Sequence, residues 1–335
     1  MNIIGITHQL SGCGYHRIIL PLGFMEGIKG YVTNYITEDK AEGWDVLLFN
    51  RICPYDTDLQ ETKKALGCKV VMDIDDDWML PPSHMNYYQF QEMADRIIKN
   101  LSNADMVTVT NKNLLEKVLP YNTNSFVLPN ALPYGRNQYH DEKHPSDKIR
   151  IFWAGGATHE RDIAILKNPL QKLKMHRDKI QMVIGGYNET DEVSKAIWNR
   201  MLSSFTCGRQ LPFMKIPAFP PTQYMNAFEH GDIMLVPLEE SEWHGCKSNL
   251  KILEAAAKRM AVVVSKVEPY SLDKDAPVLW VEKQSDWFTH INLLINDADA
   301  RQQLGNQLYE WAKEKYNLTE INKRRAELYE GLCKA

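Results

Sequence analysis

The acidic stretch at residues 70–78, VVMDIDDDW, concentrates side chains that can do chemistry. Four aspartates, Asp73, Asp75, Asp76 and Asp77, fall within five consecutive positions directly after an apolar run. Carboxylates this close together repel one another unless cations, protons or hydrogen-bond donors compensate their charge. The stretch could therefore hold a metal ion, orient a hydroxyl group, handle a proton, or form a solvated turn.

Two glycine-rich turns each follow an apolar run and precede a helical pattern, at residues 11–17 (SGCGYHR) and 151–162 (IFWAGGATHERD). Backbone N–H groups in such a turn can bind an anion at the helix N-terminus. Either turn alone is equally well explained as a tight turn or a helix cap. Their matched positions in the two halves of the chain favour anion binding. The candidate residues are Gly12, Gly14, Gly155, Gly156, Thr158 and Arg161.

A third stretch, WHGCKSNLKILEAAAKRMAVVVS at residues 243–265, predicts a capped helix that leads directly into a strand. Two lysines near the start of that helix oppose its dipole, so an anion bound between them would relieve the repulsion. The alternative is an exposed helical face with one ion pair, which contributes only a few tenths of a kcal/mol. The candidate residues are Lys247, Ser248 and Asn249 (either of which can cap the helix), Lys251 and Glu254.

The composition is that of an ordinary globular protein, with 44% apolar and 24% charged residues in a chain of 335. The net charge of -4 does not favour nucleic acid as a partner, although a local basic patch could still bind it. The six cysteines form no CxxC pair, and no signal peptide or membrane-spanning apolar run is apparent. These features predict a cytoplasmic protein, located in the host cytoplasm if it is viral.

Strand-like and helix-like segments alternate along almost the whole chain, which predicts α/β layers with parallel sheets. The strands are expected at residues 2–7, 31–35, 45–50, 68–74, 106–110 and 125–128, and then at 149–154, 181–185, 213–216, 233–236, 261–265 and 278–281. The helices are expected at residues 15–26, 58–65, 87–101, 111–118, 162–174, 191–203, 221–230, 248–259 and 287–294, with a helical tail over 297–334.

Two Rossmann-like domains follow from this order. The first spans residues 1–135, a proline-rich linker covers 136–148, and the second spans 149–315. The last segment, 316–335, is expected to be helical. Ligands bind at the carboxyl edges of such sheets, where loops and helix N-termini converge.

The sequence resembles the retaining glycosyltransferases of family 4 (glycosyl transferases group 1), which have the GT-B fold. The resemblance covers nearly the whole chain and rests on the order of the first glycine turn, DIDD, VLPN, AGGATHERD and KSNLKILEAAA. It implies two Rossmann-like domains with parallel sheets facing across a cleft, and a C-terminal helix, residues 316–335, that crosses back and packs on the first domain. It also implies transfer of a sugar from a UDP- or GDP-sugar with retention of configuration, without a metal or other cofactor.

The resemblance assigns donor-binding roles to residues of the second half. Glu254 matches the second glutamate of the family's E-x7-E motif and would bind the donor ribose, whereas Cys246 stands where the first glutamate is expected. Arg161 falls where the family has a lysine for the diphosphate, and Gly156 replaces a family arginine. Lys247, in preference to Lys251, is expected to supply the missing cation.

The aspartates occupy the acceptor side in this comparison. A metal site is disfavoured because they lie in the first domain, whereas the diphosphate signals lie in the second. Asp75 and Asp76 are expected to orient an acceptor hydroxyl or stabilise the positive charge of an oxocarbenium-like transition state. His16 is expected beside them.

Three neighbours of these aspartates are given other roles. Asp73 and Asp77 are expected only to cap or close the turn, and Trp78 is expected to form an apolar platform for a sugar or base.

Several alternatives stay open at this level. The acceptor could be a glycan, a lipid-linked sugar, a protein side chain or a hydroxymethylated DNA base, and the oligomeric state is open. Instead of a transferase, the chain could be a nucleotide-sugar epimerase or hydrolase of the same fold. It could also be a binding protein that has lost turnover.

Overall fold

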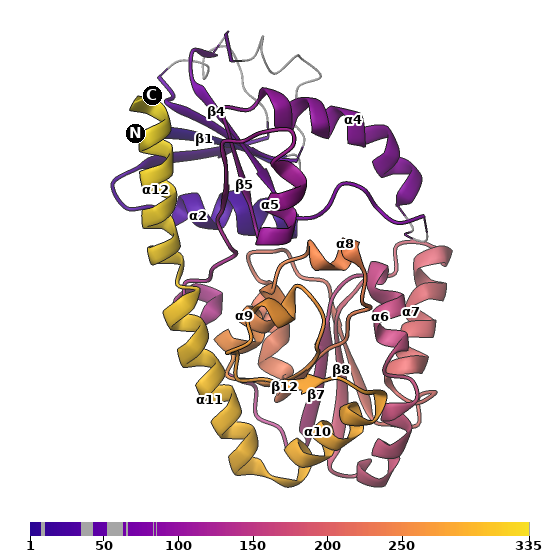
Figure 1. The fold of residues 1–335 in the computed structure, drawn as a ribbon. Helices are drawn as coiled ribbons and strands as arrows, with labels where there is room; N and C mark the ends of the chain where they lie inside the picture. Colours follow the sequence, from indigo (N-terminus) through magenta and orange to yellow (C-terminus); the bar gives the residue numbers. More distant parts are fainter. Residues whose placement is uncertain are drawn as a thin grey trace. The chain divides into compact units, whose positions relative to one another are not determined.

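Two six-stranded sheets, both entirely parallel, form the framework of the chain (Figure 1). The computed structural model describes residues 1–7, 11–34, 43–51, 63–64, 66–82, 84 and 86–334. The chain divides into two compact units. Unit 1 comprises Met1–Ala131, Gly245–Ser248 and Tyr316–Ala335, and unit 2 comprises Leu132–His244 and Asn249–Lys315.

The sheet of unit 1 has the strand order β2-β1-β3-β4-β5-β6. All six strands predicted for this half are present. They are β1 (Asn2–Ile6), β2 (Lys29–Thr33), β3 (Val46–Asn50), β4 (Lys69–Ile74), β5 (Met106–Val109) and β6 (Ser125–Val127). The strand that follows β1 in the chain, β2, lies on one side of it, and all later strands lie on the other side. The loops that leave the carboxyl ends of β1 and β3 therefore diverge, which is where ligands bind in such sheets.

Both faces of this sheet are buried, as its short, continuously apolar strands predict. Successive residues of β3 alternate between two cores: Leu47 packs in one, and Val46 and Leu48 pack in the other. The helices of this half are α1 (Gly12–Gly14), the π-helical η1 (Tyr15–Ile19), α2 (Leu20–Gly23), α4 (Tyr87–Asn103) and α5 (Lys112–Val118). The helix predicted at residues 58–65 lies almost entirely outside the described residues.

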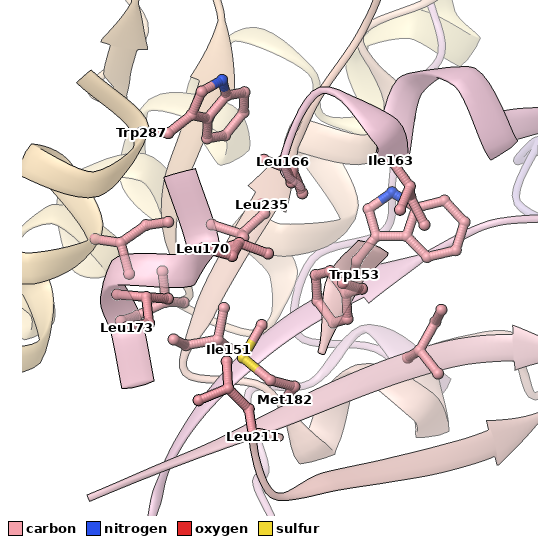
Figure 2. Close-up of a cluster of buried hydrophobic side chains, with 14 of the residues drawn as sticks. Ile151, Trp153, Ile163, Leu166, Leu170, Leu173, Met182, Leu211, Leu235 and Trp287 are labelled. Atoms are coloured by element: carbon pink, nitrogen blue, oxygen red, sulfur yellow. The ribbon is translucent and has the colours of Figure 1, made fainter. Parts of the chain in front are cut away.

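The sheet of unit 2 has the order β12-β11-β10-β7-β8-β9, so β7 marks its reversal point. Its strands are β7 (Ile149–Ala154), β8 (Ile180–Tyr187), β9 (Phe213–Pro217), β10 (Ile233–Val236), β11 (Ala261–Ser265) and β12 (Leu279–Val281), all at predicted positions. On one face, Trp153 and Met182 of the strands pack against Ile163, Leu166 and Trp287 of the covering segments (Figure 2).

The helical segments of unit 2 include several short 3-10 turns. They are η4 (Ala157–His159), α6 (Glu160–Ala164), η5 (Pro169–His176), α7 (Glu192–Phe205), η6 (Tyr224–His230), α9 (Leu250–Ala257), η7 (Tyr270–Leu272), α10 (Gln284–Asn296) and α11 (Ala298–Lys315). The single helix predicted over residues 162–174 is wrong. The α-helix α6 ends at Ala164, and Pro169, which lacks an N–H, cannot continue an α-helical hydrogen-bond pattern, so the chain proceeds as the 3-10 segment η5.

The last helix, α12 (Leu318–Lys334), belongs to unit 1, as predicted (yellow in Figure 1). Tyr329 and Leu332 are buried in the same core as Ile3 and Val46. The side-chain amide of Asn322 donates to the carbonyl of Pro21 at 2.9 Å. The C-terminus therefore completes a core that the N-terminal strands begin.

Two segments are grouped differently from the domain boundaries expected above. Residues 136–148, expected to be a linker, are tied to unit 2, where Gln138 accepts from the backbone of Met225 at 3.0 Å. Gly245–Ser248, expected in the second domain, belongs to unit 1. A further short 3-10 turn, η3 (Asn137–Tyr139), lies in the first of these segments, and α8 (Glu242–Gly245) runs into the second. Among the described residues, no helix is both long enough and apolar enough to cross a membrane.

Candidate functional site

The reversal point of the unit 2 sheet carries the second glycine turn, directly after β7. The backbone N–H of Gly155 donates to Gly185 at 3.2 Å, which fixes the turn against β8. Gly186 has a φ of +85°, and a Cβ added there would lie 2.5 Å from the carbonyl oxygen of Gly155. Only a residue without a side chain lets β8 approach the turn this closely. Gly156 and Thr158 follow on the exposed side of the turn.

Lys251, in the first turn of α9, brings that helix to the glycine turn. Its Nζ donates to the carbonyl oxygen of Ala154 at 2.6 Å, and it lies 5.4 Å from the centre of the Trp153 ring. A cationic group and a turn rich in backbone N–H groups therefore meet at the carboxyl edge of β7. This combination can bind an anion such as a diphosphate.

Glu254 lies one turn further along α9 and is buried. Burial raises the pKa of its carboxyl to about 8, although the charge of Lys251 acts in the opposite direction. The hydroxyl of Tyr224 is also buried, and burial together with the Glu254 charge raises its pKa. At neutral pH, Glu254 is a carboxylic acid that can both donate and accept hydrogen bonds.

The segment after the glycine turn is held by a buried carboxylate. Asp162 accepts from the backbone of Glu239 at 2.9 Å, and its other oxygen lies 2.7 Å from Nδ1 of His159. His159 is therefore engaged with Asp162. Arg161 extends outward with 62% of its side chain exposed, 3.4 Å from Glu239. Its guanidinium stays accessible to an anionic ligand.

The expected cap of the α9 helix is wrong. Asn249 is the N-cap residue but makes no side-chain capping bond, and its amide donates instead to Asp273 at 2.7 Å. Ser248 belongs to unit 1, where its hydroxyl accepts from the amide of Asn130 at 2.9 Å. Both polar groups have long-range partners, which compete with a local cap.

The segment Gly245–Ser248 is anchored inside unit 1. Cys246 is buried in its apolar core, so a glutamate at this position would place a carboxylate among hydrocarbon side chains. The side-chain amides of Asn111 and Asn113 donate to Gly245, and the amide of Asn111 also donates to Lys247 at 2.6 Å. The placement of Lys247 in the second domain is therefore wrong, whereas its role toward the donor stays a prediction.

Each aspartate of the acidic stretch contacts a cation within unit 1. Their partners, in chain order, are Arg17 for Asp73, Arg51 for Asp75, Arg51 and Lys247 for Asp76, and Lys117 for Asp77. The self-repulsion noted from the sequence is thus compensated by protein side chains. Among the residues that the structure describes, no group of His, Cys, Asp or Glu has an arrangement suited to a metal ion.

Asp73 forms a buried ion pair, which corrects its expected role in the turn. Nε and one terminal nitrogen of Arg17 each donate to one carboxylate oxygen of Asp73, both at 2.8 Å. The Thr108 hydroxyl adds a hydrogen bond of 2.6 Å. The two ionic side chains are only 1% and 3% exposed. Asp73 is therefore fully engaged in holding unit 1 together.

Asp75 and Asp76 follow β4 and are only partly buried. Arg51 donates to Asp75 at 2.8 Å and to Asp76 at 3.3 Å, and the ammonium of Lys247 lies 3.5 Å from Asp76. Burial opposes the charge of Asp75, but the charge of Arg51 and hydrogen bonds from Arg51 and Asn50 outweigh it. The pKa of Asp75 consequently lies well below its usual range. It is a stable anion and a weak base.

Asp77 closes the turn, as expected, and Trp78 is part of the core. Asp77 accepts from the backbone of Met79 at 2.9 Å and from Lys117 at 2.6 Å. Trp78 is buried, with its ring 6.0 Å from that of Tyr121 in an edge contact. The expectation that Trp78 offers a platform to a sugar or base is wrong, because its faces pack within unit 1.

The first glycine turn leads into a continuous helical segment with a π-helical stretch. The hydroxyl of Ser11 caps it by accepting from the backbone of Gly14 at 3.1 Å, while Gly12 is exposed. His16 lies in the π-helical stretch and is buried. Burial, with a contribution from the charge of Arg17, lowers its pKa to about 4. Its imidazole is therefore neutral at physiological pH.

Arg51 is the main residue that sequence reasoning missed. It has a φ of 60°, and it contacts both candidate acceptor-side carboxylates. A non-glycine residue in this conformation is uncommon and is often found at functional sites. The only signal in the sequence is its position directly after the third strand, at the carboxyl edge of the sheet.

The predicted site residues therefore fall into two groups, each within one unit. Unit 2 brings together the glycine turn, the outward-facing Arg161, and the lysine and glutamate of α9. Unit 1 brings together the acidic stretch, the first glycine turn and the Gly245–Ser248 segment. The unit 2 group is Gly155, Gly156, Thr158, Arg161, Asn249, Lys251 and Glu254, and the unit 1 group is Gly12, Gly14, His16, Asp75, Asp76, Lys247 and Ser248.

Solved structures with the same architecture are glycosyltransferases of the GT-B fold, so the chain has that fold. HepE of Anabaena, solved in complex with UDP, is 12% identical, with 98% of this chain and 99% of that chain covered at a TM-score of 0.66. A glycosyltransferase from Rickettsia africae is 13% identical over 99% and 98%, at a TM-score of 0.65. Sucrose-phosphate synthase from Thermosynechococcus elongatus is 13% identical over 87% and 74%, at 0.61. The sequence matches no protein-family model, and a search of curated proteins finds no match.

Proposed function

We propose that this protein is a glycosyltransferase that moves a sugar from a nucleotide diphosphate sugar to a hydroxyl acceptor, with retention of configuration and without a metal ion. The observation that carries the proposal is the meeting of α9 with the turn after β7, through the 2.6 Å hydrogen bond from Lys251 to Ala154. This contact brings a cation to a glycine turn at the carboxyl edge of β7, and buried Glu254 lies one helical turn further along α9. HepE, with the same fold, has been solved with UDP and with UDP-glucose.

The donor is assigned to unit 2. The glycine turn and Lys251 would bind the diphosphate, with Arg161 supplying a second, accessible positive charge. These cations can stabilise the charge that develops on the leaving diphosphate, which is the task a metal ion performs elsewhere. Glu254 would hydrogen-bond the ribose hydroxyls. Lys247 remains a candidate for the same diphosphate.

The acceptor is assigned to unit 1, near Asp75 and Asp76. A carboxylate with a low pKa is a poor general base, so the geometry favours electrostatic stabilisation and orientation of the acceptor over proton abstraction. The proton of the acceptor hydroxyl would then pass to the departing diphosphate on the same face of the sugar. His16, as a neutral imidazole, can hydrogen-bond a hydroxyl without carrying charge.

The most informative test is a panel of UDP- and GDP-sugars incubated with the protein in EDTA, with and without acceptors. The acceptors are monosaccharides, a serine-containing peptide and a hydroxymethylated oligonucleotide. Nucleotide release that requires an acceptor supports transfer. Release without any acceptor indicates a hydrolase or epimerase, and activity that EDTA abolishes contradicts the metal-free mechanism.

Substitution of the acidic pair separates the two sides of the site. Asp75→Asn and Asp76→Asn are expected to lower kcat on the order of 100-fold, the scale of one catalytic side chain, while donor Kd changes little. Asp95→Asn, an acid-to-amide change at an exposed position of α4, serves as control. Equal losses in kcat and in donor affinity would argue against the acceptor-side assignment.

The donor assignment is tested at Glu254. Glu254→Ala should weaken binding of the donor nucleotide, measured by calorimetry, by roughly 10-fold or more, since it removes hydrogen bonds worth about 1.5 kcal/mol or more. Glu192→Ala, at an exposed position of α7, should leave the affinity unchanged. Unchanged affinity in Glu254→Ala would refute the motif assignment.

A further inference from the structure

A cavity of about 510 Å³ lies in unit 1 at the edge of the sheet opposite to the acidic stretch. Its walls include Asp45, Cys68 and Asp105, which precede β3, β4 and β5, and Lys69, the first residue of β4. It therefore lies at the amino ends of the three strands, whereas Asp75 and Asp76 follow the carboxyl end of β4. The volume is in the range of pockets that bind small organic molecules.

Both carboxylates of this cavity are already engaged by protein donors. Asp45 accepts from the backbone N–H of Asn2 at 2.6 Å. One oxygen of Asp105 accepts from the backbone of Val70 at 2.7 Å, and the other accepts from Nζ of Lys63 at 2.6 Å. The charge of Asp105 is therefore balanced by Lys63, whereas Asp45 is held by a neutral backbone donor and keeps its negative charge.

Two further lysines in the wall have no such partner. Within the described ranges of the chain, no carboxylate lies within ion-pair distance of the ammonium groups of Lys64 or Lys69. A third cation, Lys29, lies 6.0 Å from the centre of the Trp44 ring, and Trp44 is also part of the wall. Among the described residues around the cavity, these three ammonium groups outnumber the one carboxylate that no cation neutralises, Asp45, so the balance of charge is positive. An anionic ligand would compensate that positive charge.

The cavity also offers an apolar wall. Trp44 is held in place by stacking on Tyr31, with ring centres 6.0 Å apart and planes inclined by 23°. A fixed aromatic ring can pack against a flat or apolar part of a ligand. Cys333, near the end of α12, is part of the wall too, and its Sγ lies 3.8 Å from the carbonyl oxygen of Asp45.

We propose that this cavity is a second ligand site, which binds a small phosphate monoester. The ammonium groups of Lys64 and Lys69 bind the phosphate as point charges, and the organic part of the ligand packs on Trp44. A dianionic phosphate matches two lysines that form no ion pair with a described carboxylate better than a neutral molecule does. The site is independent of the proposed sugar transfer, so a negative result for one proposal leaves the other unaffected.

The test uses Cys333 as a reporter inside the cavity. The full-length protein is treated with N-ethylmaleimide, and modification of each cysteine is followed by peptide mass spectrometry with AMP or adenosine present. These probes differ only in the phosphate. At an AMP concentration several times Kd, we expect modification of Cys333 to slow by about fivefold. Adenosine should have no effect.

Variants at the lysines identify the residues responsible. Lys64→Gln together with Lys69→Gln should abolish the protection by AMP, whereas Lys112→Gln, an exposed lysine of α5, should preserve it. Lys64→Gln alone changes an exposed side chain and keeps the test valid if the double variant does not fold; it should weaken the protection. Equal protection by adenosine, no protection by AMP, or protection that survives loss of both lysines would each overturn the proposal.

Discussion

Individual carboxylates in the acidic stretch have different tasks because each has a different cation and a different exposure. Asp73 shares its charge with a buried guanidinium, whereas Asp76 keeps a quarter of its side chain exposed beside Arg51 and Lys247. A buried, doubly hydrogen-bonded pair contributes structure, and a partly exposed carboxylate can still meet a ligand. Of the four aspartates, Asp75 and Asp76 have the most exposed side chains.

The buried pair should dominate the stability of unit 1. Asp73→Asn leaves the Arg17 guanidinium buried without a counter-charge, so we expect the free energy of unfolding to fall by about 3–5 kcal/mol. Asp76→Asn, in the same stretch but more exposed, should cost about 1 kcal/mol or less. Urea denaturation of both variants measures the difference. Similar small losses for the two would contradict the structural role of Asp73.

Glu254 should give the protein a pH-dependent loss of stability. Its carboxyl titrates at an ordinary pKa of 4.5 in the unfolded chain and at about 8 in the folded one. Between these values the unfolded state has released a proton that the folded state keeps, so stability falls as pH rises from about 5 to 8. Glu254→Gln removes this contribution. Across this range, the unfolding free energy of the native protein should therefore fall relative to that of the variant. A constant difference between the two proteins would be inconsistent with a raised pKa.

At the scale of elements, the candidate donor site depends on how closely β8 passes the turn after β7. Gly186 has a backbone conformation that side chains disfavour and no room for a Cβ beside Gly155. The conformation of the turn is therefore determined by its contact with β8 as well as by its own residues. Lys251 of α9 fixes the same turn from another direction, through the carbonyl of Ala154.

A methyl group at Gly186 should displace the turn. Gly186→Ala carries the strain of a positive φ, roughly 1–2 kcal/mol, and in addition places a Cβ against the Gly155 carbonyl. Gly208→Ala is a matched control, since its φ is +69° but no atom lies within 4 Å of the added Cβ. Both variants should lose stability, and only Gly186→Ala should also lose affinity for the donor nucleotide in calorimetry. Loss of affinity in both variants would show that strain alone is responsible.

At the scale of the whole molecule, unit 1 is built from three separate pieces of the chain. The backbone passes between the units four times, after residues 131, 244, 248 and 315. The final crossing delivers α12, whose Tyr329 and Leu332 complete the core on one face of the first sheet. Neither unit therefore corresponds to one continuous half of the sequence.

Truncation after Lys315 should unfold unit 1 while unit 2 keeps its sheet. Loss of α12 exposes the apolar side chains that Tyr329 and Leu332 cover, and each buried aromatic or leucine contributes several kcal/mol. Hydrogen exchange should show unprotected amides in β1 and β3 and protected amides in β7 and β10. Truncation after Cys333, which removes only the last two residues, serves as control. Retained protection in β1 without α12 would show that the helix is dispensable.

The sequence by itself determined the strands, their parallel pairing and the fold type. Short apolar runs separated by helical patterns specify buried parallel strands locally, and all twelve predicted strands are present in the described residues. The glycine turns after the first strand of each sheet were likewise readable, because their residue types meet a local backbone requirement. The return of the last helix to unit 1 was expected only from the family resemblance.

Only the tertiary structure decided which charges meet. Arg17 and Asp73 are 56 residues apart, and Asp76 and Lys247 are much further apart, so no local period could pair them. The same holds for the segment Gly245–Ser248. It is attached to unit 1 by burial of Cys246 in the apolar core and by hydrogen bonds from the side-chain amides of Asn111 and Asn113. A charged side chain has many candidate partners along a sequence. The pair that forms is selected by packing, because burial makes an unpaired charge too costly to keep.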